Sequence, residues 1–270
     1  MSDLLAQYGS SYDLNIEMFN RLQHTITGWP GGKPDADDSN RPERKEPSKK
    51  KVIIFSPHPD DDVISMGGTF DRLVSQGHEV HVAYQTSGNI AVSDQDALKF
   101  IEVNSDIMQG DQSKTVSDLK NAIQSINTQK PVPKSKCDLK ASIRKRESLA
   151  ATRYIGIPDS QVHFMNLSFY ETGTIKKNPF SKKDIDETIS LIESIKPHQI
   201  FAAGDLSDPH GTHRVCLNII FESLKILKTK KFMNDCWVWL YRGAWHEWDI
   251  HEIDMAVPMS PAQVLSLIHI

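Results

Sequence analysis

From Lys51 onward the sequence alternates short apolar runs with amphipathic segments of helical period. We predict strands at 52–56, 79–85, 162–166, 199–203 and 236–241, and helices at 63–76, 94–129, 139–154, 182–195 and 214–227. Strands joined by helical crossovers pair in parallel and leave both faces of the sheet for helices to cover. The alternation therefore predicts an α/β, Rossmann-like fold: a mostly parallel sheet with helices on both faces.

A stretch rich in proline, glycine and charge precedes this pattern. Residues 28–50 hold few apolar side chains, which is typical of a solvated linker, and one amphipathic helix is predicted before them, at 13–26. We therefore expect an N-terminal helical segment at 1–27, a linker at 28–50 and one domain at 51–270. The last residues, 264–270, stop inside an apolar pattern, so we interpret the chain as a fragment with a C-terminally truncated domain.

Composition narrows the classes of partner. The chain has 31 basic and 35 acidic residues, a net charge of −4, which favours neither a nucleic acid nor an anionic membrane. It has no apolar run of about 18 residues and no signal-peptide pattern at its start. The cysteines, Cys137, Cys216 and Cys236, are odd in number and widely spaced, as reduced thiols are. We expect a cytoplasmic protein, with homo-oligomerisation left open.

Polar clusters directly follow two of the predicted strands. The first is Pro57–Asp62, which contains one histidine and three aspartates, and the second runs from Asp205 to His213. Ligands of open α/β sheets gather at the carboxyl ends of the strands, so we expect the clusters to meet there. Alone, the first is also typical of a turn with a helix N-cap, and the second of a surface histidine pair. Their joint occurrence favours a metal site.

These clusters hold the residue types that zinc prefers. A catalytic zinc takes three imidazole or carboxylate ligands and keeps one open position, and His58, Asp61 and His213 supply such a set. Asp60 leaves the strand end in another direction and is a candidate base. His210 and His213 share a helix face, so one can bind metal while the other faces a substrate. Two histidines and a carboxylate also describe non-haem iron oxygenases, which the α/β pattern disfavours.

The same residues carry a family resemblance. Ser56–Asp62 with Gly67-Gly68-Thr69, and then Asp208–His213, resemble the LmbE/PIG-L family of zinc-dependent N-acetylglucosaminide deacetylases over about residues 51–259. Residues 86–89 and 144–147 are weaker matches. The resemblance implies a Rossmann-like domain in which His58, Asp61 and His213 hold the metal, Asp60 is the general base and His210 stabilises the oxyanion.

What the resemblance implies about activity is a metal-dependent hydrolase. Zinc, or another divalent metal such as Fe²⁺, would polarise an acetamide and its bound water, and Asp60 would take the proton from that water and return it to the sugar amine. The expected partner is a small N-acetylglucosamine-type amino sugar. Two residues depart from the family pattern: Asp62 replaces a glutamate, and Thr212 replaces an acid, whose charge Asp208 is placed to supply.

Two further stretches bear on the function. Residues 12–21 and 28–34 resemble the segment that joins such a domain to a glucosamine-6-phosphate deaminase/isomerase-like domain in larger bacterial proteins. The alternative function is therefore a non-catalytic sugar-binding or regulatory domain of a larger amino-sugar enzyme. Residues 241–248 are rich in aromatics and contain Arg242, which suits stacking on a sugar with a phosphate contact and equally suits core or lid packing.

Overall fold

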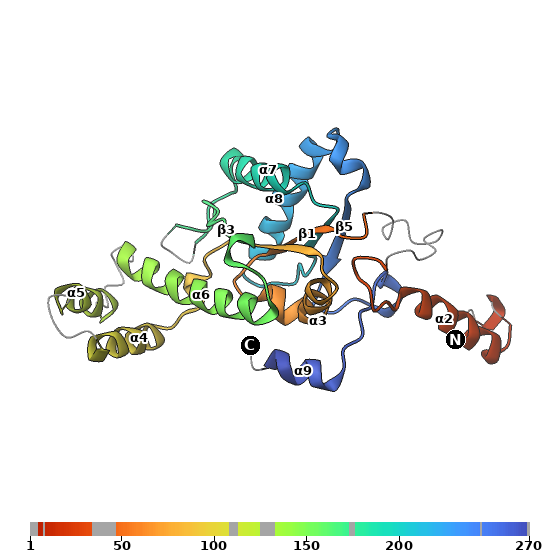
Figure 1. Cartoon of the computed structure of the whole chain (residues 1–270), viewed down its shortest axis with the longest axis horizontal. Coiled ribbons are helices and arrows are strands. Elements are labelled where there is room, and N and C mark those ends of the chain that lie inside the picture. The colour runs from red at the N-terminus through yellow and green to blue at the C-terminus, as the bar shows by residue number, and fades with distance from the viewer. Residues whose placement is uncertain are drawn as a thin grey trace.

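The computed structural model describes residues 5–7, 9–33, 47–107, 113–124, 133–172, 176–243 and 245–268. At its centre is one five-stranded sheet in the order β3-β2-β1-β4-β5, in which every neighbouring pair is parallel (Figure 1). The strands are β1 Lys51–Ser56, β2 Glu79–Tyr84, β3 Val162–Phe164, β4 Gln199–Ala203 and β5 Trp237–Tyr241. The predicted parallel α/β sheet is confirmed.

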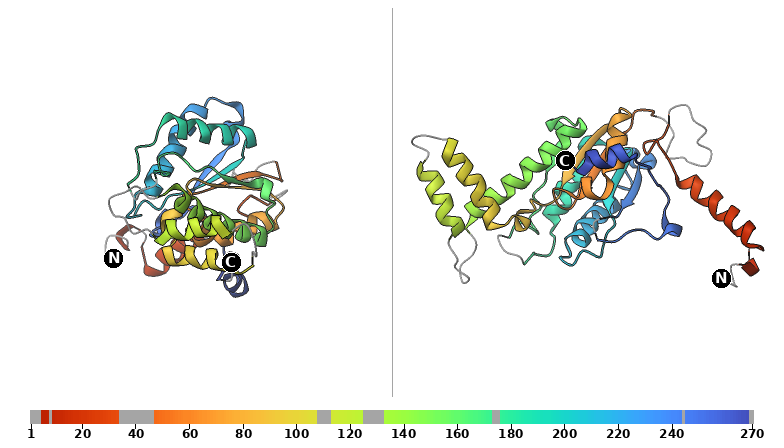
Figure 2. Two further views of the ribbon diagram at one scale, coloured as in Figure 1. Left: turned by 90° about the vertical axis from the view of Figure 1, so that its left-hand side faces the viewer. Right: turned by 90° about the horizontal axis from the view of Figure 1, so that it is seen from below.

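Helices cover both faces of this sheet, as predicted. Figures 1 and 2 show α3 and α6 on one face and α7 and α8 on the other, with α2 extending from the body at one end. Their bounds are α2 Ser11–Thr25, α3 Asp61–Ser75, α6 Lys134–Ile155, α7 Lys182–Ile195 and α8 Thr212–Leu227. The short helix α9, Pro261–Ile268, lies against α3. In the part of the chain described, no helix is long and apolar enough to cross a membrane.

Strand residues divide between two cores according to their parity. Val52 and Ile54 of β1 pack with Phe70 of α3, whereas Ile53 and Phe55 pack with residues of α7 and α8. Successive side chains of a strand point to opposite faces, so each central strand contributes to both cores. Burial on both faces explains why these strands are continuous apolar runs.

The predicted helix at 94–129 contains two helices, α4 Asp94–Ile107 and α5 Ser113–Gln124, and residues 125–129 lie outside those described. These two helices pack together and against α6 through a small separate core around Ile101, Ile123 and Ile143. Helix α6 begins five residues before the predicted 139. Lys136 and Lys140 in its first turns form ion pairs with Asp94 of α4, a tertiary contact that local periodicity does not reveal.

Helix α3 carries the Gly67-Gly68 pair. Met66, with φ −142° and ψ 22°, leaves the helical conformation just before it. A Cβ atom on Gly68 would lie 2.0 Å from the sulfur of Met259, and one on Gly67 would lie 3.0 Å from a methyl of Leu267. The glycine pair therefore lets the C-terminal segment pack directly on α3.

Part of the predicted linker packs against the amino ends of the strands. Pro30 is buried, and its carbonyl accepts a hydrogen bond from the side chain of Gln199 at 3.2 Å. Gly31 lies so close to the His78 ring that a Cβ there would meet its Nε2 at 2.1 Å. Residues 30–32 thus close one end of the sheet, and residues 34–46 of the linker lie outside those described. The domain boundaries themselves stay a prediction.

Candidate metal centre

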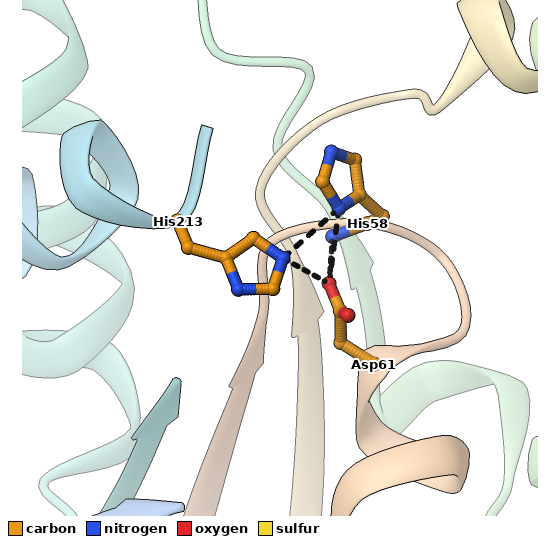
Figure 3. A group of neighbouring side chains, drawn as sticks. All are labelled: His58, Asp61 and His213. Carbon is orange, nitrogen blue, oxygen red and sulfur yellow. Dashed lines mark hydrogen bonds and ion pairs between the residues drawn. The ribbon is translucent and has the colours of Figure 1, made fainter. Parts of the chain in front are cut away.

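Three side chains from distant parts of the chain converge at the carboxyl end of the sheet (Figure 3). His58 lies in the turn after β1, Asp61 begins α3, and His213 lies in the first turn of α8, which follows β4. The Asp61 Oδ2 atom is 3.1 Å from His58 Nδ1 and 3.3 Å from His213 Nε2, and the two nitrogens are 3.3 Å apart. The structure therefore brings together the three residues predicted as metal ligands.

This triangle of atoms suits a bound cation. Donor atoms at about 2.1 Å from a tetrahedral zinc lie about 3.4 Å from one another, close to the three separations found here. His213 Nδ1 lies 3.1 Å from the backbone carbonyl of Asp205, to which it donates in the tautomer that leaves the Nε2 lone pair for the centre. The donor set and its tautomer fit a divalent metal, whose identity the geometry leaves open.

The Asp61 carboxylate is the anion of the group. Burial by itself would raise the pKa of Asp61, but the hydrogen bonds that His213 and His58 donate when these ring nitrogens carry protons hold that pKa below its ordinary value. The His58 backbone N–H also donates to Asp61 Oδ2 at 2.8 Å, which fixes the turn between β1 and α3. A carboxylate that stays ionised between two imidazoles is suited to ligate a cation.

Asp60 is held by a different partner. It occupies the N-cap position of α3 but makes no side-chain capping bond, and its Oδ2 instead lies 2.7 Å from a guanidinium nitrogen of Arg144 in α6. Arg144 also pairs with Glu147 at 3.2 Å, and its Nε is buried without a hydrogen-bond acceptor among the described residues. The sequence match at 144–147 thus corresponds to a contact that orients the predicted base. That Asp60 acts as a base stays a prediction.

His210 and His213 share one carboxylate. Asp208 Oδ1 lies 3.0 Å from His210 Nδ1 and accepts the His210 backbone N–H, while Asp208 Oδ2 accepts the His213 backbone N–H at 3.1 Å. Asp208 is fully buried, and the Thr212 hydroxyl finds no partner among the described residues. The negative charge beside His210 therefore comes from Asp208, at the position expected from the sequence.

His210 stands outside the donor group. Its side chain is 61% exposed, and its ring meets that of Trp245 edge-on, with centroids 5.9 Å apart. This places an imidazole, steadied by Asp208, on the open side of the loop after β4. Its role in stabilising an oxyanion stays a prediction.

Asp62, next to Asp61 at the start of α3, has its own set of hydrogen-bond partners. Tyr84 donates a hydrogen bond to Asp62 Oδ2 at 2.8 Å, and Ser56 Oγ lies 3.2 Å from Oδ1. Complete burial raises the pKa of Asp62 to about 7, against the opposing effect of the bonds from Tyr84 and Ser56. The side chain that departs from the family pattern thus links β1, β2 and α3.

Sequence reasoning missed three neighbours of the site. Tyr170 meets the His58 ring edge-on with centroids 6.2 Å apart, and Lys177 donates to the His210 carbonyl at 2.8 Å. The Asp205 carboxylate accepts backbone N–H groups of Trp245 and His246, which fastens the loop after β5 to the loop after β4. Tyr170 and Lys177 lie in irregular chain without motif spacing, so only Asp205, inside the second cluster, carried a signal.

A family model and a curated protein both match this chain. A family model described as PIG-L, GlcNAc-PI de-N-acetylase, matches residues 53–224. A glucosamine-6-phosphate deaminase-like protein of Bacteroides thetaiotaomicron is 51% identical over 273 residues, which covers 98% of this chain and 41% of that protein. The chain therefore spans less than half the length of this curated relative.

Solved structures resemble the chain more distantly. An N,N'-diacetylchitobiose deacetylase from Pyrococcus horikoshii is 19% identical, with a TM-score of 0.49 over 93% of this chain and 77% of that one. A deacetylase of teicoplanin biosynthesis is 14% identical, with a TM-score of 0.47 over 81% of each chain. A 4-carboxy-2-hydroxymuconate hydratase from Pseudomonas putida is 17% identical, with a TM-score of 0.42 over 68% of this chain and 59% of that one. The family match spans both strand-end clusters, and the chain belongs to the PIG-L family.

Proposed function

We propose that this chain is a metal-dependent N-deacetylase that hydrolyses the acetamide of an N-acetylated amino sugar. The observation that carries the proposal is the convergence of His58, Asp61 and His213, with Asp60, which precedes Asp61 in the sequence, paired to Arg144. Membership of a family described by its de-N-acetylase activity supports the same reaction.

His58, Asp61 and His213 would hold the cation. Once bound there, a divalent metal supplies a Lewis acid for the amide carbonyl and lowers the pKa of a coordinated water toward about 7. The three residues differ in exposure: Asp61 and His213 are buried, whereas the His58 side chain is 22% exposed. His58 therefore borders the side from which a substrate enters.

Asp60 and His210 would move the protons and stabilise the charge. Asp60 takes a proton from the attacking water, the oxygen of that water bonds to the amide carbon, and the carbon–nitrogen bond then breaks as Asp60 delivers the proton to the departing nitrogen. His210, oriented by Asp208, would donate to the tetrahedral oxyanion, a contribution of about 3 kcal/mol in comparable sites. The products are acetate and a free amine.

The substrate class rests on related proteins. The relative from Bacteroides thetaiotaomicron is described as glucosamine-6-phosphate deaminase-like, and the Pyrococcus horikoshii protein is a diacetylchitobiose deacetylase. Both descriptions concern amino sugars, which favours an N-acetylglucosamine-type substrate here. Zinc is the metal that we propose, with iron(II) as the alternative, because two imidazoles and one carboxylate suit either ion.

Acetate release from N-acetylglucosamine and its β-1,4-linked disaccharide, with and without added zinc, tests the proposal. We expect Asp60→Asn to lower kcat by about a hundredfold to ten-thousandfold while the protein retains stoichiometric metal. Asp159→Asn is the matched control, because Asp159 pairs with Arg153 on the protein surface. Metal binding without acetate release from any N-acetylated sugar would contradict the proposed function, and so would full activity of Asp60→Asn.

A further inference from the structure

A cavity lies along the edge strand of the sheet. It has a volume of about 920 Å³ and extends along β5, the outermost strand on the side opposite β3 (Figure 1). Ser65, Met66 and Thr69 of α3 form one wall, and residues 252–255 and 257 form another. Ligand-binding pockets fall in the range of about 300–1,000 Å³, so this cavity is large enough for a small molecule.

The far wall of the cavity is fixed by backbone pairing. Ala256 donates to the Thr25 carbonyl at 2.8 Å and accepts the Thr27 N–H at 2.8 Å, which forms a short bridge between the end of α2 and the segment after β5. The end of α2 is therefore tied to the segment that follows β5.

Aromatic side chains form the floor. Trp237, Trp239 and Tyr241 alternate along β5 and so project from the same face, and Trp237 and Trp239 stack with an interplanar angle of 24° and centroids 6.2 Å apart. Trp237 remains 39% exposed. Large aromatic faces arranged in a row are suited to stack on the C–H faces of flat, ring-shaped ligands.

One polar atom in this floor lacks a partner. Trp239 lines the cavity, and its indole Nε1 is buried without an acceptor within the described ranges. A buried N–H that is left unpaired costs free energy, so native structures usually supply an acceptor from protein, water or ligand. This N–H is closed off from the cavity, so an oxygen acceptor there would pair with it only after the indole ring turns.

The charges around the cavity select a neutral occupant. Among the described lining residues the cation is Arg242, which stacks on Trp248 at 3.6 Å and donates to the Gly204 carbonyl at 3.0 Å, so its guanidinium already has protein partners. Glu252 and Asp254 add two carboxylates, which accept hydrogen bonds from hydroxyl groups and repel anions. A neutral ligand with hydroxyl donors, ether or hydroxyl acceptors and an apolar ring face complements this lining.

We propose that the β5 cavity binds a neutral saccharide, as a site separate from the metal centre. Its aromatic floor would stack on sugar rings, and Glu252 and Asp254 would accept hydrogen bonds from sugar hydroxyls. None of the three metal-binding candidates lines this cavity. The inference therefore stands or falls independently of the proposed deacetylase activity.

Titration with cellobiose tests this inference on the chain as it stands. Cellobiose has no acetamide, so the proposed chemistry of the metal centre does not act on it. We expect saturable binding by calorimetry, with a dissociation constant in the millimolar range and an accompanying change in tryptophan fluorescence. Trp237→Ala should raise that constant about tenfold, the equivalent of roughly 1.4 kcal/mol of stacking. Trp237→Phe should bring it back to near the original value, because it restores an aromatic face.

Two further variants separate the sites. His58→Ala should leave cellobiose binding unchanged, whereas Glu252→Gln, an exposed substitution that folding tolerates, should weaken it by about threefold through one lost charge-assisted bond. Digalacturonate, the anionic counterpart, should bind more weakly than cellobiose because of the two carboxylates.

Several results would overturn the inference. One is the absence of saturable cellobiose binding at millimolar concentrations, and another is binding that His58→Ala abolishes and Trp237→Ala does not affect. The exposed edge of β5 is also able to pair with a peptide strand or with a second copy of the chain. Self-association in light scattering that Trp237→Ala removes and cellobiose does not disturb would assign the cavity to that partner instead.

Discussion

Histidines stand at both ends of the sheet, and their surroundings differ. At the amino end, His78 Nδ1 accepts the Lys50 backbone N–H at 3.1 Å, and His198 Nδ1 accepts the Lys51 N–H at 2.9 Å. At the carboxyl end, the nitrogens of His58 and His213 point toward one carboxylate oxygen. The two ends show that the role of a histidine depends on its partner. A ring that accepts a backbone N–H acts as a neutral cap at the start of a strand, whereas a ring that faces a shared carboxylate is a candidate metal ligand.

The largest contrast is expected from matched alanine substitutions at the two ends. His213→Ala should remove tightly bound metal and lower deacetylase activity by about a thousandfold, or roughly 4 kcal/mol, because the proposed site loses one of its three ligands. His198→Ala should keep metal and activity and lower only the free energy of unfolding. Metal analysis, acetate release and urea denaturation of both variants measure this. If both variants lost the same amount of metal, the proposed difference between the histidines at the two ends of the sheet would be wrong.

The second effect concerns stability against pH. Burial, with the nearby charge of Lys50, lowers the pKa of His78 to about 4 from 6.5, so the unfolded chain binds more protons between these values. Stability is therefore complete above about pH 6.5 and falls as the pH drops toward 4, by up to about 3 kcal/mol. His78→Gln should remove this part of the pH dependence in urea denaturation curves. An unchanged pH dependence would show that His78 is not the group responsible.

A smaller effect is expected from the residue that holds Asp60. Arg144→Gln should lower kcat by about tenfold, roughly 1.4 kcal/mol, with metal retained, because Asp60 loses the partner that orients it. Arg144→Lys should recover part of that loss, since an ammonium group keeps the charge without the fork geometry. Measuring kcat and metal content together separates this positioning role from a ligand role. Loss of metal in Arg144→Gln would contradict it.

Much of the site at the carboxyl ends of the strands was predictable, because the residues that mark it lie close together in the sequence. Two short clusters follow two apolar runs, and parallel strands bring their carboxyl ends to one edge. The pairing of β1 with β4 places His58 near His213, an order of strands that the alternation of elements alone does not fix. Each of the two clusters runs from the loop after its strand into the first turn of the following helix. The family resemblance added roles that the spacing alone left open between His210 and His213.

The amino end was not predictable in the same way. His78 and His198 are single histidines before strands, and their partners are backbone groups, which no residue pattern marks. Composition likewise predicted a solvated stretch from residue 28, yet Gly31 and its neighbours are buried because small residues pass close to His78. Contacts between distant segments, such as Arg144 with Asp60, depend on how α6 packs across the sheet. Periodicity reports which face is apolar and says nothing about that placement.

The Asp208 carboxylate has a consequence for how this chain tolerates sequence change. One of its oxygens contacts His210 and the other accepts the His213 backbone N–H. A substitution at position 208 therefore alters the surroundings of both histidines at once. Because Asp208 supplies the charge, position 212 does not need an acidic residue and can hold any side chain that fits its buried volume. Inherited variation in this loop is therefore expected to accumulate at Thr212 and to be rejected at Asp208.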